Sequence, residues 1–226
     1  MTTMSTDTTT PITLPLGTGP AGTDVRWALT DEHGHPRHGL IVGPTGSGGS
    51  TALARLATGA HAAGVRPSII ALEYGTDYLD PAWDQAPWNA AWCVDADQLI
   101  GDTEELLAHA GPAPAPRLVL VDGGMALRCA PHLWERLLGQ ADRLRVSVVV
   151  RVYAPTAGEM GTGVVRDLLL ARGQYLALGR SLGTTAAVAQ DLLAGYTPPV
   201  GRQAPGAGVY GHQGRVAPVN VTAPNA

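Results

Sequence analysis

The sequence predicts a three-layer α/β fold with a mostly parallel central sheet and a terminal β-hairpin. Apolar strand-like runs alternate with helix-like segments, a glycine-rich turn joins one strand to a helix, and another strand ends in a carboxylate. Strands are expected at residues 12–16, 25–29, 39–42, 68–72, 92–94, 118–122, 146–152, 175–178, 208–210 and 215–219. Helices are expected at residues 51–63, 95–109, 133–144, 164–171 and 185–193. In such a sheet, ligands bind at the carboxyl ends of the strands.

Local composition justifies the individual elements. Residues 12–16 and 25–29 are two short β-rich runs that precede the core sheet and are separated by a turn. The helix at 95–109 begins at an aspartate cap and is closed by Gly111. Residues 146–152 form the most strongly β-branched run of the chain and should be a central buried strand. A His-Gln-Gly turn joins the last two strands into the hairpin.

Length and composition indicate one domain. With 226 residues and 45% hydrophobic content, the chain can bury a full core. Residues 1–11 are expected to be a disordered tail and residues 12–226 the domain. A formal net charge of −4 excludes a globally basic nucleic-acid binder, but a local arginine patch stays possible. Cys93 and Cys129 lack zinc-site spacing and should be small buried thiols of a reduced, cytoplasmic protein without signal peptide or membrane span.

A glycine-rich loop is the most informative motif. It matches the phosphate-binding pattern G-x-x-x-x-G-K-[ST], except that Gly49 replaces the lysine. Successive backbone N–H groups at a helix start can hold phosphate without any side chain. All 15 basic residues are arginines, so a substitute cation must be an arginine of this chain or of a partner subunit. A glycine-rich turn without ligand is the alternative. The candidate nucleotide-binding residues are Gly43, Pro44, Thr45, Gly46, Ser47, Gly48, Gly49, Ser50 and Thr51.

Asp122 ends the apolar strand at residues 118–122. In phosphate-loop proteins, an acid at such a place lies across from the loop hydroxyl and helps to hold Mg²⁺, so Ser50 and Asp122 are the candidate metal ligands. The alternative is a helix-cap or turn residue. Gly123 and Gly124 follow, and neither glycine can act as a general base.

Three further groups carry weaker signals. Three histidines lie in a Gly- and Pro-containing loop without regular metal-ligand spacing: His33, His35 and His38. Three tryptophans either stack on a base or anchor a partner or, as we favour, fill the space over a long loop: Trp83, Trp88 and Trp92. Three arginines near the central strand form either a DNA contact or, as we favour, a solvated helix end: Arg143, Arg145 and Arg151.

Taken together, the motifs resemble the motor domain of the FtsK/SpoIIIE family of DNA-pumping ATPases, including TraB-like transfer proteins of actinobacterial plasmids. The resemblance covers most of residues 12–220. It is carried by the lead-in Leu-Pro-Leu-Gly, the loop with its preceding strand, the strand that ends at Asp122, and the closing hairpin. The chain departs from the family at Gly49, at Gly123 where an acid is expected, and at Tyr153-Ala154, where the family has Gln-Arg before a proline.

The resemblance implies a P-loop NTPase (RecA-like) fold that binds ATP and Mg²⁺, with hydrolysis weak or lost. It also implies a homo-oligomeric ring, or an assembly with an active ATPase of the family, and contact with double-stranded DNA in transfer or segregation. The alternative is a non-catalytic scaffold or regulatory subunit that keeps only the fold, which the loss of several hydrolytic groups favours.

Overall fold

The structure, a computed structural model, describes residues 10–71, 92–93, 96–108, 115–171 and 173–221. Its strands are β1 (Thr13–Thr18), β2 (Asp24–Ala28), β3 (Gly39–Val42), β4 (Arg66–Ile70), β5 (Trp92–Cys93), β6 (Arg117–Asp122), β7 (Val146–Val152), β8 (Gln174–Leu178), β9 (Ala207–His212) and β10 (Arg215–Asn220). They form one sheet in the order β2-β1-β10-β9-β8-β3-β7-β6-β4-β5. All of the expected strands are therefore present; those at 39–42 and 146–152 have the expected bounds, and the others have shifted ends.

The expectation of a mostly parallel sheet is wrong for the sheet as a whole, which is mixed. The strands from β8 to β5 are paired in parallel. The closing hairpin, β9 and β10, extends the same sheet antiparallel to β8, and β1 and β2 continue it beyond β10. Strands joined by short turns run antiparallel, so both hairpins introduce antiparallel pairs when they add to the edge.

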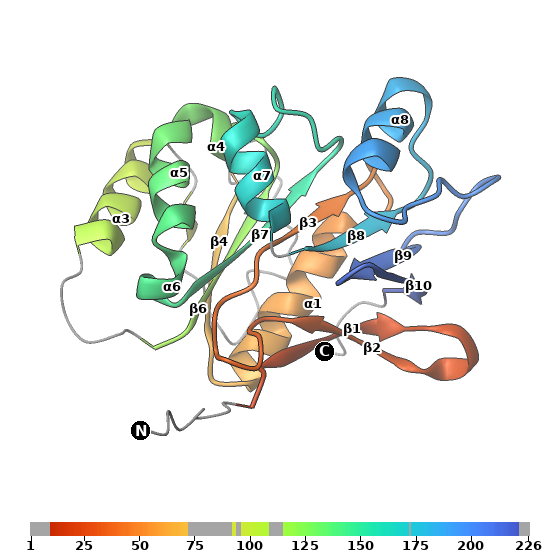
Figure 1. Cartoon of the computed structure of the whole chain (residues 1–226), viewed down its shortest axis with the longest axis horizontal. Coiled ribbons are helices and arrows are strands. Elements are labelled where there is room, and N and C mark those ends of the chain that lie inside the picture. The colour runs from red at the N-terminus through yellow and green to blue at the C-terminus, as the bar shows by residue number, and fades with distance from the viewer. Residues whose placement is uncertain (1–9, 72–91, 94–95, 109–114, 172, 222–226) are drawn as a thin grey trace, which may run out of the picture.

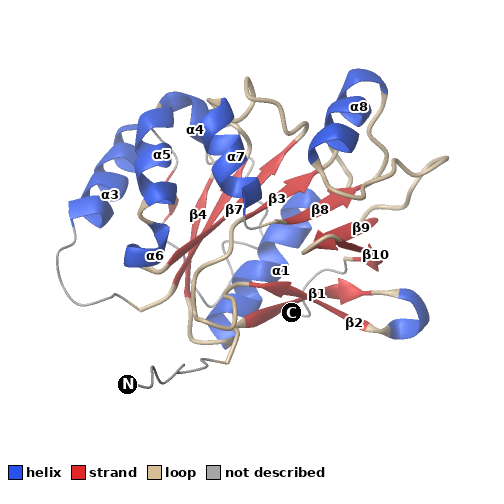
Figure 2. Ribbon diagram, viewed as in Figure 1, coloured by secondary structure: helices blue, strands red, loops and turns tan. Residues whose placement is uncertain are grey.

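One long helix covers the first face of the sheet. This is α1 (Gly49–Ala62), which starts directly after the glycine-rich loop and packs against β1, β4 and β6 (Figures 1 and 2). Its Leu53 and Leu56 are fully buried with Ile41, Leu120 and Val149 of the sheet. The helix packs on the sheet along its length because its buried positions recur with the helical period.

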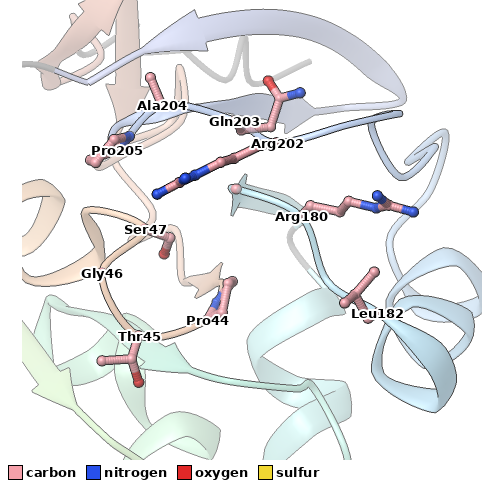
Figure 3. Close-up of a pocket in the computed structure, with 11 residues that line it drawn as sticks. Pro44, Thr45, Gly46, Ser47, Arg180, Leu182, Arg202, Gln203, Ala204 and Pro205 are labelled. Carbon is pink, nitrogen blue, oxygen red and sulfur yellow. The ribbon is translucent and has the colours of Figure 1, made fainter.

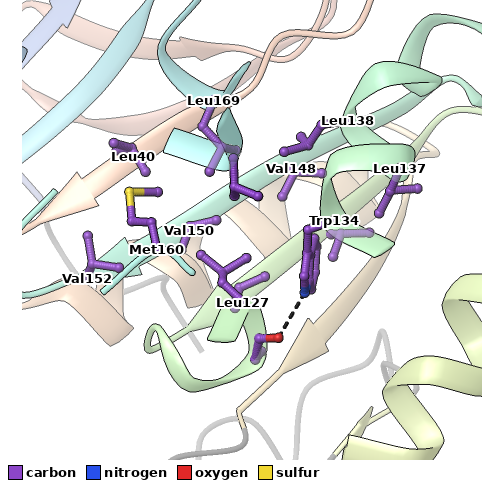
Figure 4. Close-up of a cluster of buried hydrophobic side chains, with 14 of the residues drawn as sticks. Leu40, Leu127, Trp134, Leu137, Leu138, Val148, Val150, Val152, Met160 and Leu169 are labelled. Carbon is purple, nitrogen blue, oxygen red and sulfur yellow. Dashed lines mark hydrogen bonds between the residues drawn. The ribbon is translucent and has the colours of Figure 1, made fainter. Parts of the chain in front are cut away.

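The second face is covered by several shorter helices. They are α3 (Ala96–Ala108), α4 (Met125–Cys129), α5 (Pro131–Gly139), α6 (Ala141–Leu144) and α7 (Gly163–Ala171), while α8 (Gly183–Leu192) follows β8. The single helix expected at 133–144 is divided at Gln140 into α5 and α6, and α4 was not predicted. Figure 4 shows the apolar cluster below them, where the buried Trp134 donates a hydrogen bond from Nε1 to the Ala126 oxygen at 2.9 Å.

The structure describes some of the histidines, cysteines and tryptophans that the sequence singles out. His38 is buried, and its Nδ1 accepts a hydrogen bond from the Val148 amide at 3.1 Å. Cys129 is exposed, so the expectation of a buried thiol is wrong for it, since it ends the short surface helix α4. Trp83 and Trp88 lie outside the described residues. Among the described helices, none is long and apolar enough to cross a bilayer.

Candidate functional site

The glycine-rich loop wraps around the N-terminal end of α1. Gly43 leaves β3 and donates its amide hydrogen to the Val152 oxygen at 3.2 Å, and the Ser47 amide closes a turn on the Pro44 oxygen at 3.1 Å. Gly46 and Gly48 have φ values of +76° and +99°, which only glycine adopts at low cost. These two conformations reverse the chain and bring it into the first turn of the helix.

The N-terminal amides of α1 are directed toward this loop. The first hydrogen bond of the helix runs from the Ala52 amide to the Gly48 oxygen at 3.0 Å, so the amides of residues 49–51 precede the helical ladder. Within the described part of the chain, no side chain caps this end, although helices usually satisfy such donors with a capping residue. The predicted nucleotide-binding residues therefore surround one helix end whose dipole favours an anion.

A cavity of about 620 Å³ opens beside the loop. It is lined by Pro44, Thr45, Gly46, Ser47, Gly179, Arg180, Leu182, Arg202, Gln203, Ala204 and Pro205. Among these described residues, both charged side chains are arginines and none is acidic. In Figure 3, Arg202 extends toward the Ser47 side of the cavity, whereas Arg180 extends toward Leu182. The cavity thus combines residues 44–47 of the glycine-rich loop with positive charge, whereas residues 48–51 and Asp122 are not among its lining residues.

Ser47 links the loop to the chain segment before β9. The Gly206 amide donates a hydrogen bond to the backbone carbonyl oxygen of Ser47 at 2.8 Å, which holds this segment against the loop. A Cβ at Gly48 would lie 2.9 Å from the Gly206 nitrogen, so the close approach requires glycine. The Ser47 hydroxyl is buried and has no hydrogen-bond partner within the described part of the chain. Such a buried polar group requires a partner, which a bound anion can provide.

The two candidate metal ligands lie together. Asp122 ends β6 and is 5% exposed, and the Ser50 hydroxyl donates a hydrogen bond to its Oδ2 at 2.8 Å. Strand alternation explains the approach: Leu118 and Leu120 pack on the α1 side of β6, so Asp122 points to that side as well. Ser50, in the first turn of α1, faces the carboxylate across this gap.

Arg151 is a third member of this group that the sequence did not assign to the site. It stands opposite Asp122 in the β6–β7 register, and its Nη1 lies 3.2 Å from Asp122 Oδ1. The side chains are 6% and 7% exposed. The guanidinium also stacks over the Tyr153 ring, with its carbon 4.7 Å from the ring centroid. The alternation of β7, in which one arginine interrupts a valine run, is the signal that could have revealed it.

The proposed DNA contact loses its local support from these arginines. Arg151 is buried beside Asp122, and Arg143 donates from Nη2 to Gln140 Oε1 at 2.6 Å and to the Leu107 oxygen at 3.2 Å. Arg145 precedes β7, whereas Arg151 is near its other end, so the two are separated by most of a strand. The three arginines therefore do not form one exposed patch.

The positions after Asp122 have no room for a water-activating acid. Gly123 has a φ of +99°, where a glutamate would be strained, and a Cβ on Gly124 would collide with the backbone oxygen of Glu159. The Glu159 carboxylate itself accepts hydrogen bonds from the amides of Tyr153 and Ala154 at 3.1 and 2.7 Å. A general base adjacent to Asp122 is therefore missing at both positions.

Comparison with solved structures defines the class of this fold. The chain is similar to the cytoplasmic domain of the type VII secretion ATPase EccC of Thermomonospora curvata, with a TM-score of 0.68, 14% identity, and coverage of 95% of this chain and 26% of EccC. It is also similar to the pCW3 conjugation coupling protein TcpA with ATPγS, with a TM-score of 0.67, 12% identity, and coverage of 94% and 66%. VirB4 of Thermoanaerobacter pseudethanolicus gives a TM-score of 0.62, 11% identity, and coverage of 93% and 96%.

These likenesses show that the chain has the same fold as these proteins, which include a secretion ATPase and a conjugation coupling protein. The chain spans less than half the length of the EccC and EssC proteins to which it is similar. No protein-family model matches the sequence, and no curated protein matches it either. At such low identity the similarity concerns the fold, and the activity must be argued from the site.

Proposed function

We propose that the chain is a nucleotide-binding domain of the FtsK/SpoIIIE and TraB-like translocase class that binds ATP and hydrolyses it weakly or not at all. The observation that carries this proposal is the uncapped N-terminus of α1, which meets the glycine-rich loop beside an arginine-lined cavity. The triphosphate lies along residues 43–51, with its charge toward the helix end and Arg202.

Two features of the cavity support a bound polyphosphate. The buried Ser47 hydroxyl has no partner among the described residues and faces the same loop. Gly46 lines the cavity, and a Cβ there would meet nothing within 4 Å, so the space around its backbone is open. Both features are expected of a cradle that is completed by ligand atoms.

Weak or absent hydrolysis follows from the groups beside Asp122. The loop has glycine instead of lysine, and the two positions after Asp122 are glycines whose conformation and packing oppose a larger residue. In related phosphoryl-transfer sites, a cation on the phosphates and a residue that orients water supply most of the rate. A domain with this site can respond to ATP binding without consuming it.

The proposed context is a multi-subunit assembly in the cytoplasm. The similar structures are secretion ATPases and a conjugation coupling protein, and this domain is proposed to work beside an active ATPase of the class or in a ring of its own copies. Double-stranded DNA is the proposed substrate of that assembly. The second candidate, a scaffold that binds no nucleotide, is favoured by the loss of the hydrolytic groups.

An ATP-binding assay with two matched loop variants tests the proposal. Gly46→Asp and Gly46→Asn have nearly the same shape and the same backbone strain at positive φ, but only the first adds a negative charge to the cavity. With fluorescent ATP, we expect Gly46→Asp to bind at least about tenfold more weakly than Gly46→Asn. Absence of binding by the native chain contradicts nucleotide binding and leaves the scaffold role.

Turnover and mass measurements separate the two roles further. Phosphate release by the purified chain should stay near the rate without protein, even at saturating ATP. Native mass in the presence and absence of ATP and duplex DNA should change with ATP if the domain is a nucleotide-gated subunit. A mass that never changes with ATP, in a chain that binds it, contradicts gated assembly.

A further inference from the structure

The Arg151 side chain lies against Gly49, the position at which the phosphate-binding pattern has a lysine. A Cβ built on Gly49 would lie 3.0 Å from Arg151 Nε and 3.1 Å from its Cγ, closer than side chains normally approach. A side chain at position 49 would therefore have to displace the Arg151 side chain by a few tenths of an ångström. Arg151 can occupy its observed position because residue 49 is a glycine and has no side chain.

The same arginine is held in place on several sides. Its guanidinium donates to Asp122 Oδ1 at 3.2 Å and lies over the Tyr153 ring. Arg151 and Asp122 are each only 5% exposed. A buried guanidinium next to a buried carboxylate stays charged and fixed, because separating the two would leave each charge uncompensated.

The carboxylate consequently offers poor coordination to Mg²⁺. Both carboxylate oxygens of Asp122 already accept hydrogen bonds. Oδ2 accepts one from the Ser50 hydroxyl at 2.8 Å, and Oδ1 accepts one from Arg151 at 3.2 Å. Mg²⁺ requires near-octahedral oxygen ligands, and an ion between Ser50 and Asp122 would also face the guanidinium at close range. The residues present therefore do not fit the metal that the fold class implies.

From this disagreement we infer that Arg151 is the resident cation of the site and that the domain binds nucleoside triphosphate without Mg²⁺. The inference rests on the proposed function. Arg151 neutralises Asp122, which removes the negative charge that would repel the phosphates. Arg202, which extends toward the Ser47 side of the cavity, then faces a metal-free polyphosphate, whose higher negative charge suits it. Arg151 acts as a positioning residue from beneath the loop.

The first experiment measures binding of fluorescent ATP to the native full chain in excess Mg²⁺ and in excess EDTA. The dissociation constants should agree within about threefold. Binding that weakens about tenfold or more in EDTA overturns the inference and leaves the proposed function standing. Absence of binding in both conditions overturns the proposed function and the inference with it.

The second experiment tests whether removing the Arg151 guanidinium makes ATP binding depend on Mg²⁺. Arg151→Ala removes the guanidinium from Asp122, so binding in EDTA should weaken at least about tenfold and Mg²⁺ should restore part of it. Arg166→Ala is the matched control, since Arg166 pairs with Asp167 on the surface. Unchanged binding of folded Arg151→Ala in EDTA overturns the role of Arg151. If this variant does not fold, the comparison of Mg²⁺ with EDTA on the native chain still decides the inference.

Discussion

The two faces of the central sheet differ in what their side chains do, and β7 shows the difference within one strand. Val146, Val148, Val150 and Val152 point to the face covered by the shorter helices and are fully buried or nearly so. The residues between them point to α1, and this set ends in Arg151 beside Asp122. One face is an apolar core, whereas the other ends in a buried ion pair below the loop.

The face covered by the shorter helices contributes mainly to stability, whereas the charged groups on the α1 face are positioned for the proposed binding. Among the described residues, the buried carboxylate and the buried guanidinium, Asp122 and Arg151, both lie on the α1 face, so the contribution of the apolar face comes from burial and close packing. The α1 face accepts a buried ion pair that contributes little to stability but fixes charge next to the helix N-terminus. Substitutions on the two faces should therefore affect different measurements.

Trp134→Ala should have the largest effect on stability. The indole is 1% exposed within the helix-covered core and donates a hydrogen bond to the Ala126 oxygen. We expect the free energy of unfolding in urea to fall by about 4 kcal/mol, because a large cavity forms. Trp134→Phe, which keeps most of the volume, should lose less. A loss that is equal for both variants would contradict the packing explanation.

Arg151→Met should have the second largest effect on stability, because it leaves the buried Asp122 carboxylate without its guanidinium partner. We expect a loss of about 3 kcal/mol in urea unfolding. The double variant Arg151→Met with Asp122→Asn removes both charges and should recover at least half of that loss. Additive losses in the double variant would show that the two side chains are not energetically coupled.

Gly49→Lys should lower stability by about 1 kcal/mol, since its side chain meets Arg151 and adds a cation at a helix N-terminus. It should not restore ATP hydrolysis, because the acid after Asp122 is still missing. In an Arg151→Ala background the same substitution should cost less, and thermal unfolding of the variants measures the coupling. An equal cost in both backgrounds would contradict competition for the same space.

The smallest expected effect concerns pH and arises at His212, at the C-terminal end of β9. Burial lowers the pKa of His212 from its ordinary value of 6.5, and the positive charge of Arg37 adds to this effect. The unfolded chain then binds a proton that the folded chain resists, so stability should fall as the pH drops below 6.5. His212→Phe should weaken this dependence in urea unfolding between pH 7 and pH 5, whereas the exposed His61→Phe should not. Identical slopes for native chain and His212→Phe would contradict this assignment.

Much of the fold was predictable because its elements have local signals. The valine run of β7 and the glycine-rich entry to α1 were placed correctly from composition and periodicity. The break at Gln140 and the short helix α4 were missed although Gly139 precedes the break and Gly124 and Pro131 flank α4, because segments of four or five residues are too short to show a helical period. The mixed sheet was missed because a hairpin's partner strand depends on contacts between distant segments.

By itself, the sequence determined that a strand, a glycine-rich loop and a helix follow one another without a lysine, because backbone conformation and apolar periodicity are local properties. Only the tertiary structure decided which cation compensates for that loss. Arg151 is about a hundred residues from Gly49 along the chain, and the register of β7 beside β6 brings it under the loop and against Asp122. Such a meeting depends on strand order, which no local pattern encodes.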